Sequence, residues 1–424
     1  METTTISTKE NIITSTAIGN AVSGGKLTAV FLVCFLSTFF SGIVSMLMSV
    51  YLTVTATDLL GNVSGEKFNN VSAWINCVFI FGWMFGGITW GIICDKIGRS
   101  KSVILSTFFY GLFTVLTAIA PSWFLVSVCR FLSGFGIGGV VVTTTILIGE
   151  LWTSKKVAVI QGMVGLAMPV GFFAAGVISN FVEDWRSPYW IGLAPVIIAV
   201  IGLFAVPESA KWKTGKQHLA EEKESINKQL FAVANRKNLF IGSVVFGAML
   251  IGLWAIFSWA PTWVQSIAAS DDARKLGGNT MMILAGSGII GSFFSGWIVN
   301  AMGLRKTMLM CFAVCFIMAF VVFKLNTVVT VSTFVEMGLL VFFFGISQGA
   351  LAVYIPALFP TAICASATGF CFNVGRLFTG TVVFFIGALE TLLGGYGNAI
   401  FIFSFIFVIG FIATWLTKEN KQAA

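Results

Sequence analysis

Residues 91–101 read Gly-Ile-Ile-Cys-Asp-Lys-Ile-Gly-Arg-Ser-Lys, and residues 296–306 read Gly-Trp-Ile-Val-Asn-Ala-Met-Gly-Leu-Arg-Lys. The two segments lie about half a chain length apart, and each follows a long apolar run. A second pair, Glu150-Leu-Trp-Thr and Ala357-Leu-Phe-Pro, repeats at nearly the same separation. This repetition predicts two related halves. In a membrane protein, parallel half-repeats place a binding site between the halves, near the middle of the bilayer.

The apolar runs around these segments are long enough to cross a membrane. Hydrophobic residues make up 57% of the 424-residue chain and charged residues 10%, whereas soluble domains carry about 25% charged residues. A helix of about 20 residues crosses the hydrocarbon layer. The sequence predicts an all-α membrane protein with twelve transmembrane helices, in two six-helix halves related by pseudo-two-fold symmetry. The expected spans are 27–51, 71–94, 101–120, 122–149, 157–182, 187–206, 239–264, 279–300, 306–325, 331–356, 362–388 and 394–417.

The polar segments predict the domain organisation and the orientation. We expect an N-terminal tail (1–26), a first half (27–206), a linker (207–238), a second half (239–417) and a C-terminal tail (418–424). Lysine and arginine gather in the tails, the linker and alternate loops, which predicts that both termini are cytoplasmic. The expected location is a plasma membrane or a bacterial inner membrane. The net charge of +8 is spread over short clusters, which argues against a nucleic-acid partner.

Four motifs in order along the chain resemble the major facilitator superfamily of transporters. They are Gly91-x3-Asp95-x2-Gly98-Arg99-x-Lys101, Arg130-x3-Gly134-x3-Gly138, Pro207-Glu208-Ser209-Ala-Lys-Trp, and Leu358-Phe-Pro-Thr with Gly369-Phe-x-x-Asn373-x-Gly375-Arg376. The third is similar to a sugar-porter-like branch, and the fourth is similar to members that carry organic acids with protons. The resemblance implies a monomeric alternating-access transporter without cofactors, which takes up a small organic anion (a carboxylate) with protons. A sugar or polyol porter of the same fold is the alternative. A membrane receptor or enzyme is disfavoured, because no span contains a histidine or an acidic pair.

The repeated loop predicts the gate on the cytoplasmic side. We expect Asp95 to face the N-terminus of the eleventh span, whose dipole favours a carboxylate by roughly 0.3–1 kcal/mol, and Arg99 to pair with Glu150. The alternative is that this loop is an ordinary positively charged turn on the cytoplasmic side, without a role in gating. In the second half, Asn300 and Leu304 stand at the positions of Asp95 and Arg99. The contacts of the second loop are therefore expected to be weaker. The predicted gating residues are Gly91, Asp95, Gly98, Arg99, Lys101, Glu150, Asn300 and Arg305.

Arg376 is the main candidate for binding the substrate. It lies near the middle of its span, where a charge costs several kcal/mol or more unless it has a partner. No acidic residue lies in the middle of any span, so a substrate carboxylate is a natural partner for the guanidinium fork. Asn373 is one helical turn earlier and shares that face. The alternative is an arginine tied to backbone carbonyls.

Other polar and aromatic residues complete the predicted site. Three roles are open for Arg130: it braces the helix bundle, it senses the protonation state of a neighbouring group, or it contacts the substrate. Trp254 is deep enough to stack on a substrate, whereas Trp259 and Trp263 are interpreted as an interfacial aromatic belt. Gln161, Gln348 and Tyr354 are further candidates to line the cavity. Proton coupling requires a titrating group, and the acidic candidates are all near interfaces: Asp58, Glu150, Glu336 and Glu390.

Overall fold

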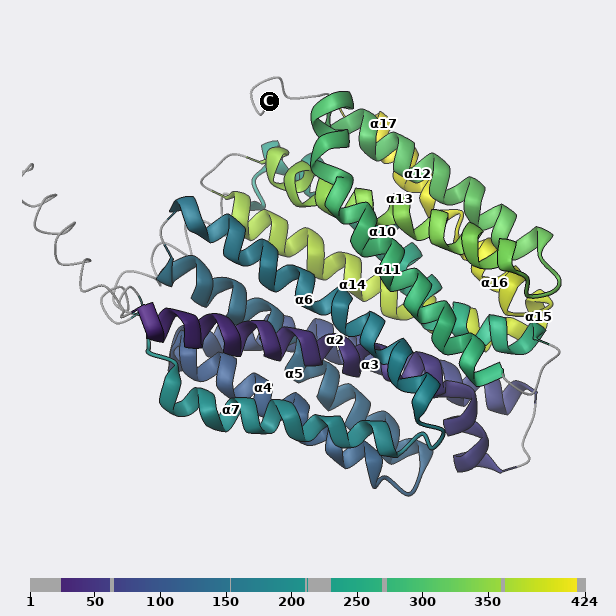
Figure 1. Cartoon of the computed structure of the whole chain (residues 1–424). Coiled ribbons are helices and arrows are strands. Elements are labelled where there is room, and N and C mark those ends of the chain that lie inside the picture. The colour runs from purple at the N-terminus through teal and green to yellow at the C-terminus, as the bar shows by residue number, and fades with distance from the viewer. Residues whose placement is uncertain are drawn as a thin grey trace, which may run out of the picture.

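A computed structural model describes residues 24–61, 65–152, 154–209, 212, 230–268, 273–359 and 363–417. Within these ranges, twelve helical segments are long and apolar enough to cross a membrane, which confirms the predicted spans. Figure 1 shows them as a long helical bundle. The helices are α2 (Gly24–Leu60), α3 (Glu66–Ile97), α4 (Arg99–Ala118), α5 (Trp123–Leu151), α6 (Ser154–Phe181), η1 (Ser187–Gly192), α7 (Leu193–Ala205), α10 (Val233–Ile267), α11 (Ala273–Met302), α12 (Leu304–Phe320), η2 (Val321–Leu325), α13 (Val331–Ala357), α14 (Cys364–Ala388), α15 (Glu390–Leu393), α16 (Tyr396–Phe403) and α17 (Ile406–Trp415).

The first helix is the clearest difference from the predicted boundaries. α2 continues to Leu60, beyond the expected end at residue 51. Its last turns are held by a side-chain contact: the indole nitrogen of Trp185 donates a 2.9 Å hydrogen bond to Asp58. Residues 1–23 of the predicted N-terminal tail, the C-terminal tail and most of the linker lie outside the described residues, and so does His218. The domain boundaries therefore remain predictions.

Glycine allows the same close helix crossing in both halves. A Cβ atom on Gly138 of α5 would lie 2.2 Å from the carbonyl oxygen of Trp83 on α3. In the second half, a Cβ atom on Gly345 of α13 would lie 2.2 Å from the carbonyl oxygen of Gly288 on α11. Small residues let membrane helices approach until their backbones touch. The crossing of α3 with α5 therefore recurs as the crossing of α11 with α13, as two related halves require.

The repeated loop also has the same backbone conformation in both halves. Gly98 precedes α4 with φ +113°, and Gly303 precedes α12 with φ +84°. Residues with a Cβ atom rarely adopt a positive φ, so glycine is needed at both positions. This requirement explains why both repeated loops have the glycine, although Asp95 and Arg99 of the first loop are not repeated in the second.

The contacts between the halves gather toward one end of the bundle. We call the end where α2 begins and α17 ends the terminal face, and the opposite end the far face. Toward the far face, Asn180 of α6 donates a 2.9 Å hydrogen bond to Asn279 of α11, and Trp74 of α3 lies 5.1 Å from Phe384 of α14, centre to centre. Toward the terminal face, Cβ atoms at Gly165 of α6 or Gly369 of α14 would have open space around them. The described contacts between the halves are thus concentrated toward the far face.

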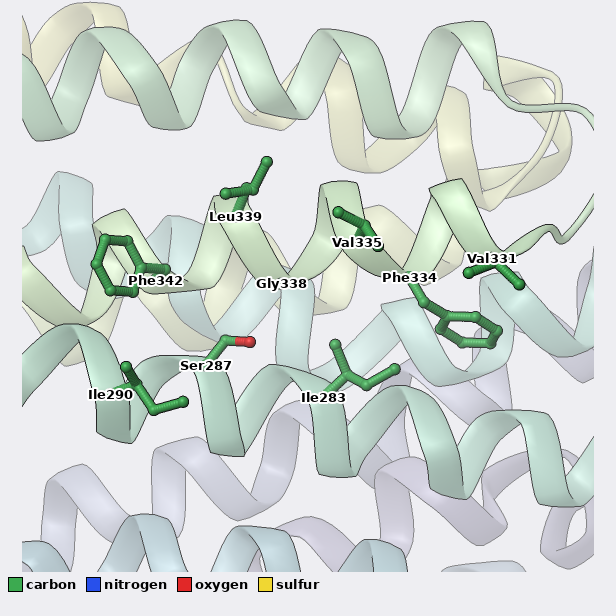
Figure 2. Close-up of a pocket in the computed structure, with 9 residues that line it drawn as sticks. All are labelled: Ile283, Ser287, Ile290, Val331, Phe334, Val335, Gly338, Leu339 and Phe342. Atoms are coloured by element: carbon green, nitrogen blue, oxygen red, sulfur yellow. The ribbon is translucent and has the colours of Figure 1, made fainter.

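A separate groove lies on the outer surface of the second half. Figure 2 shows it between α11 and α13, with Ser287 as the one oxygen-bearing side chain among those drawn. Its volume is about 580 Å³. Ile290, Val335 and Leu339 on its rim are about half exposed, as expected of side chains that face lipid. It shares no residue with the candidate site described next.

Candidate functional site

Arg376 is the central residue of α14 and lies between the two halves. Its Nη1 atom is 3.4 Å from the Oδ1 atom of Asn373, which is long for a hydrogen bond. The ion pairs seen among the described residues belong to Arg99, Arg186 and Arg274. Within that part of the chain, Arg376 therefore has no carboxylate partner and no backbone carbonyl. Most of its five donors are available to a ligand.

Asn373 and Gly87 lie on the terminal side of Arg376. The amide nitrogen of Asn373 donates a 3.0 Å hydrogen bond to the carbonyl oxygen of Gly369, which turns its Oδ1 atom toward Arg376. A Cβ atom on Gly87 of α3 would lie 3.7 Å from that Oδ1 atom. The missing side chain at Gly87 thus leaves the Asn373 amide open to the space between the halves.

Two buried tryptophans, one from each half, close the other side of Arg376. The guanidinium carbon of Arg376 lies 5.7 Å from the ring centre of Trp83 on α3. The Trp83 ring meets the Trp254 ring of α10 edge to face, with 5.3 Å between centres. The structure thus brings Arg376, Asn373 and Trp254 together, through Trp83. Sequence reasoning missed Trp83, although a tryptophan in the middle of a span, away from the interfaces, is unusual enough to have indicated it.

Arg130 has a different environment, inside the first half. It is 2% exposed, and it donates hydrogen bonds to the carbonyl oxygens of Val44 (2.8 Å) and Ser45 (3.4 Å) on α2. Its guanidinium carbon lies 4.0 Å from the centre of the Phe79 ring. These neutral partners brace α5 against α2. They favour the predicted bracing role of Arg130 over substrate contact.

The remaining predicted cavity residues have no described contact with Arg376. Gln161 donates a 3.2 Å hydrogen bond to the carbonyl oxygen of Thr145. The amide nitrogen of Gln348 is buried without a hydrogen-bond partner. The Tyr354 hydroxyl shares a 2.6 Å hydrogen bond with Thr417 at the end of α17, within the second half. That bond favours packing for Tyr354, and the binding roles of Gln161 and Gln348 remain predictions.

At the terminal face, Arg99 joins three helices of the first half. Its Nε atom donates a 2.9 Å hydrogen bond to Glu150 on α5, and its Nη1 atom lies 3.0 Å from Asp95 on α3. The same Nη1 atom donates to the carbonyl oxygen of Cys94. The expected pair of Arg99 with Glu150 is present. Asp95 bonds Arg99 in this structure, and its contact with the N-terminus of α14 remains a prediction.

Glu208 completes this cluster and was not among the predicted site residues. One carboxylate oxygen accepts hydrogen bonds from the backbone N–H groups of Arg99 (2.8 Å), Ser100 (3.1 Å) and Ser209 (3.0 Å). A carboxylate at the N-terminus of α4 is favoured by the unsatisfied N–H groups and the helix dipole there. Gly98 makes room for it, since a Cβ atom there would lie 2.2 Å from the carboxylate. The signal in the sequence was the acidic residue of the Pro207-Glu208-Ser209 motif.

Among the described residues, the corresponding loop of the second half has fewer hydrogen bonds and no ion pair, in line with the expected weaker contacts. Arg305 donates a hydrogen bond to the carbonyl oxygen of Trp415 at the end of α17. Asn300 is exposed, and so is Lys101 in the first-half loop. A Cβ atom at Gly91 would meet one side chain, Val142, at 4.0 Å, so close packing does not require glycine there. The gating roles of Lys101, Asn300 and Gly91 remain predictions.

At the far face, hydrogen bonds that the sequence did not reveal join the two halves. Asn69 of α3 donates to the carboxylate of Glu390 at 2.6 Å and to the hydroxyl of Thr391 at 3.0 Å. It also accepts a 2.9 Å hydrogen bond from Tyr396. Partners more than three hundred residues apart in the chain are not readable from one sequence. These bonds hold the far face closed in this conformation.

The interpretation of Trp259 and Trp263 as an interfacial belt was wrong. Trp259 is fully buried and Trp263 is 3% exposed. Trp259 stacks on Tyr396 with 5.2 Å between ring centres and donates a hydrogen bond to the carbonyl oxygen of Val383. Both tryptophans pack inside the bundle because α10 lies among other helices and not at the lipid boundary.

Comparison with known proteins agrees with this architecture. The cis,cis-muconate transport protein of Acinetobacter baylyi is 26% identical over 407 residues, which cover 92% of this chain and 94% of that protein. The sialic acid transporter NanX of Escherichia coli is 27% identical over 336 residues, covering 76% and 78%. The inward-open structure of the xylose transporter XylE from E. coli has a TM-score of 0.76 at 16% identity, covering 93% of this chain and 97% of that one. The family model of the Major Facilitator Superfamily matches residues 27–380. Because this match runs from the first span into the eleventh, the chain belongs to the Major Facilitator Superfamily.

Proposed function

We propose that this protein carries a small organic carboxylate across a membrane by alternating access, with Arg376 binding the carboxylate. The observation that carries the proposal is the environment of Arg376. It lies at mid-span between the two halves, and its contacts among the described residues are a long one to Asn373 and one to the Trp83 ring. A guanidinium with free donors binds a carboxylate through two parallel hydrogen bonds. The muconate and sialic acid transporters, by their names, carry carboxylic acids.

In the proposed cycle, the two halves rock about the site and open it to one face at a time. The far face is closed by Asn69, Glu390 and Tyr396, which supports assigning the described conformation to the state that is open at the terminal face. Closing that face brings the terminal ends of α3 and α14 together, which is the step in which we expect Asp95 to meet the N-terminus of α14. The Arg99 cluster keeps the first half rigid during this movement.

We further propose that the terminal face is cytoplasmic, with both chain termini inside. The motif loop carries Lys96, Arg99 and Lys101 and the linker is rich in lysine, which the positive-inside rule places in the cytoplasm. The described conformation is then inward-open. A monomer in a plasma or bacterial inner membrane is the proposed working form.

Uptake coupled to protons is the finer part of the proposal and comes from the family resemblance. The acidic side chains in the described spans lie near helix ends, for example Glu336, which accepts a 2.6 Å hydrogen bond from Asn326. A proton that moves with the substrate therefore moves on such an end group or on the substrate's own carboxyl group. Accumulation driven by an imposed pH gradient, inside alkaline, is the expected result in proteoliposomes.

A competition assay separates the carboxylate proposal from its sugar or polyol alternative. The purified protein in proteoliposomes should take up labelled cis,cis-muconate or nicotinate, and other carboxylates should compete while xylose and sorbitol should not. The matched control is the amide of each acid, which keeps shape and loses charge. Absence of uptake of either labelled acid, together with uptake of labelled xylose or sorbitol, would refute the carboxylate proposal and favour the alternative.

A further inference from the structure

The charge at the centre of the site differs between the empty and the loaded protein. In the empty site Arg376 has one long contact to Asn373 and the face of the Trp83 ring. A bound carboxylate neutralises the guanidinium. While the terminal face is open, water can solvate the empty site. When both faces close, the empty site must hold an unpaired cation in a water-poor, low-dielectric space, which is costly.

Among the described residues, no acidic side chain forms an ion pair with Arg376. Of the acidic groups described at the terminal face, Asp95 and Glu150 are bonded to Arg99, and Glu208 accepts hydrogen bonds from backbone N–H groups at the start of α4. At the far face Glu390 accepts from Asn69. The sequence has no aspartate or glutamate in the middle of any span. The substrate is therefore the partner that makes passage through the closed state inexpensive.

We infer that the empty protein changes conformation slowly because of the free charge on Arg376, so that exchange of one anion for another is faster than net transport. This inference rests on the proposed function, since it requires Arg376 to bind the anion. It adds two points to the proposed function. The conformational change of the empty protein limits the rate of net transport, and the charge of the Arg376 guanidinium determines that rate.

Asn373→Asp tests the inference directly, because it places a carboxylate one turn from Arg376 at the position of the present 3.4 Å contact. The internal carboxylate should neutralise Arg376 in the empty protein and compete with the substrate. Asn373→Ser is the matched control, since it also removes the amide but adds no charge. A reporter thiol is introduced as Ser179→Cys, at a side chain that is fully buried between α6 and α11 toward the far face.

Maleimide labelling of that thiol reports each opening of the far face and needs no substrate. In Ser179→Cys protein without anion, labelling should be slow. Adding Asn373→Asp should speed it by about tenfold or more, and adding Asn373→Ser should not. Protein without the reporter gives the blank. The thiol of Cys315, fully buried in the second half, must remain unlabelled, which separates gate opening from unfolding. Equal labelling rates in the aspartate variant and its parent would overturn the inference.

Transport gives an independent readout. With labelled cis,cis-muconate outside, unlabelled muconate inside the vesicles should accelerate uptake by the wild type. In the Asn373→Asp variant that acceleration should disappear. If the wild type binds carboxylates and shows no acceleration, the inference fails and the proposed function stands. If neutral sugars alone bind, the proposed function fails as well.

Discussion

Arg376→Gln is expected to lower carboxylate transport by about 30-fold or more. Removing one partner of a buried, hydrogen-bonded charge pair costs about 2–5 kcal/mol of binding, and every 1.4 kcal/mol is about a tenfold change in affinity. Arg376→Lys keeps the charge and loses the planar fork, so an intermediate loss is expected. The measurement is initial uptake of labelled carboxylate into proteoliposomes that contain equal amounts of folded protein.

The fold of the Arg376→Gln variant should survive, because the substitution removes an unpaired charge from mid-span. Arg130→Gln is the contrasting variant. Arg130 is buried on the carbonyl oxygens of Val44 and Ser45, so its loss leaves polar groups unsatisfied and lowers stability. Normal carboxylate transport by Arg376→Gln would contradict the proposed site. Lost folding in Arg376→Gln, with Arg130→Gln unaffected, would show that the two arginines have the opposite roles.

Arg99→Leu is expected to be the most destabilising change at the terminal face. Arg99 is 6% exposed, and its removal leaves the carboxylates of Asp95 and Glu150 without their described cation. Breaking a buried ion pair on one side typically costs about 3–5 kcal/mol. Transport should fall with stability, since the first half loses the contact that joins α3, α4 and α5.

Arg305→Leu is the matched control in the repeated loop of the second half. Arg305 has one described hydrogen bond, to the carbonyl oxygen of Trp415, so its loss should cost about 1 kcal/mol. The comparison is made by thermal unfolding of the two purified variants in the same detergent. A larger loss in Arg305→Leu than in Arg99→Leu would contradict the asymmetry between the halves.

The length of the apolar runs was enough to predict the twelve spans, because a helix that crosses hydrocarbon must hide its backbone over a fixed thickness. Their ends were less predictable. α2 continues past residue 51 because it is held by Trp185 through Asp58, a contact between segments far apart in sequence. Trp259 and Trp263 were misplaced for a related reason. The sequence indicates how deep in the membrane a residue of a span lies, but it does not indicate which other helices cover that face of the helix.

The centre of the site was partly predictable for an energetic reason. A charged residue at mid-span is rare and costly, so Arg376 stands out in the sequence, and helical periodicity adds Asn373. Trp83 comes from the other half, and no local pattern connects it with α14. The far-face bond of Asn69 with Glu390 joins residues more than three hundred positions apart in the chain. Such contacts between distant segments have no local pattern in the sequence that would identify them.

The central claim is that a negative charge is bound at Arg376, and ligand-induced thermal stabilisation of the purified wild type measures this most directly. Each carboxylate is compared with its own uncharged amide, at the same concentration and in the same detergent. A ligand at 100 times its dissociation constant should stabilise the protein by about 2.7 kcal/mol. Stabilisation by the acid, none by the amide, and loss of the response in Arg376→Gln are the predicted result. Equal stabilisation by acid and amide, or an unchanged response in Arg376→Gln, would contradict the account.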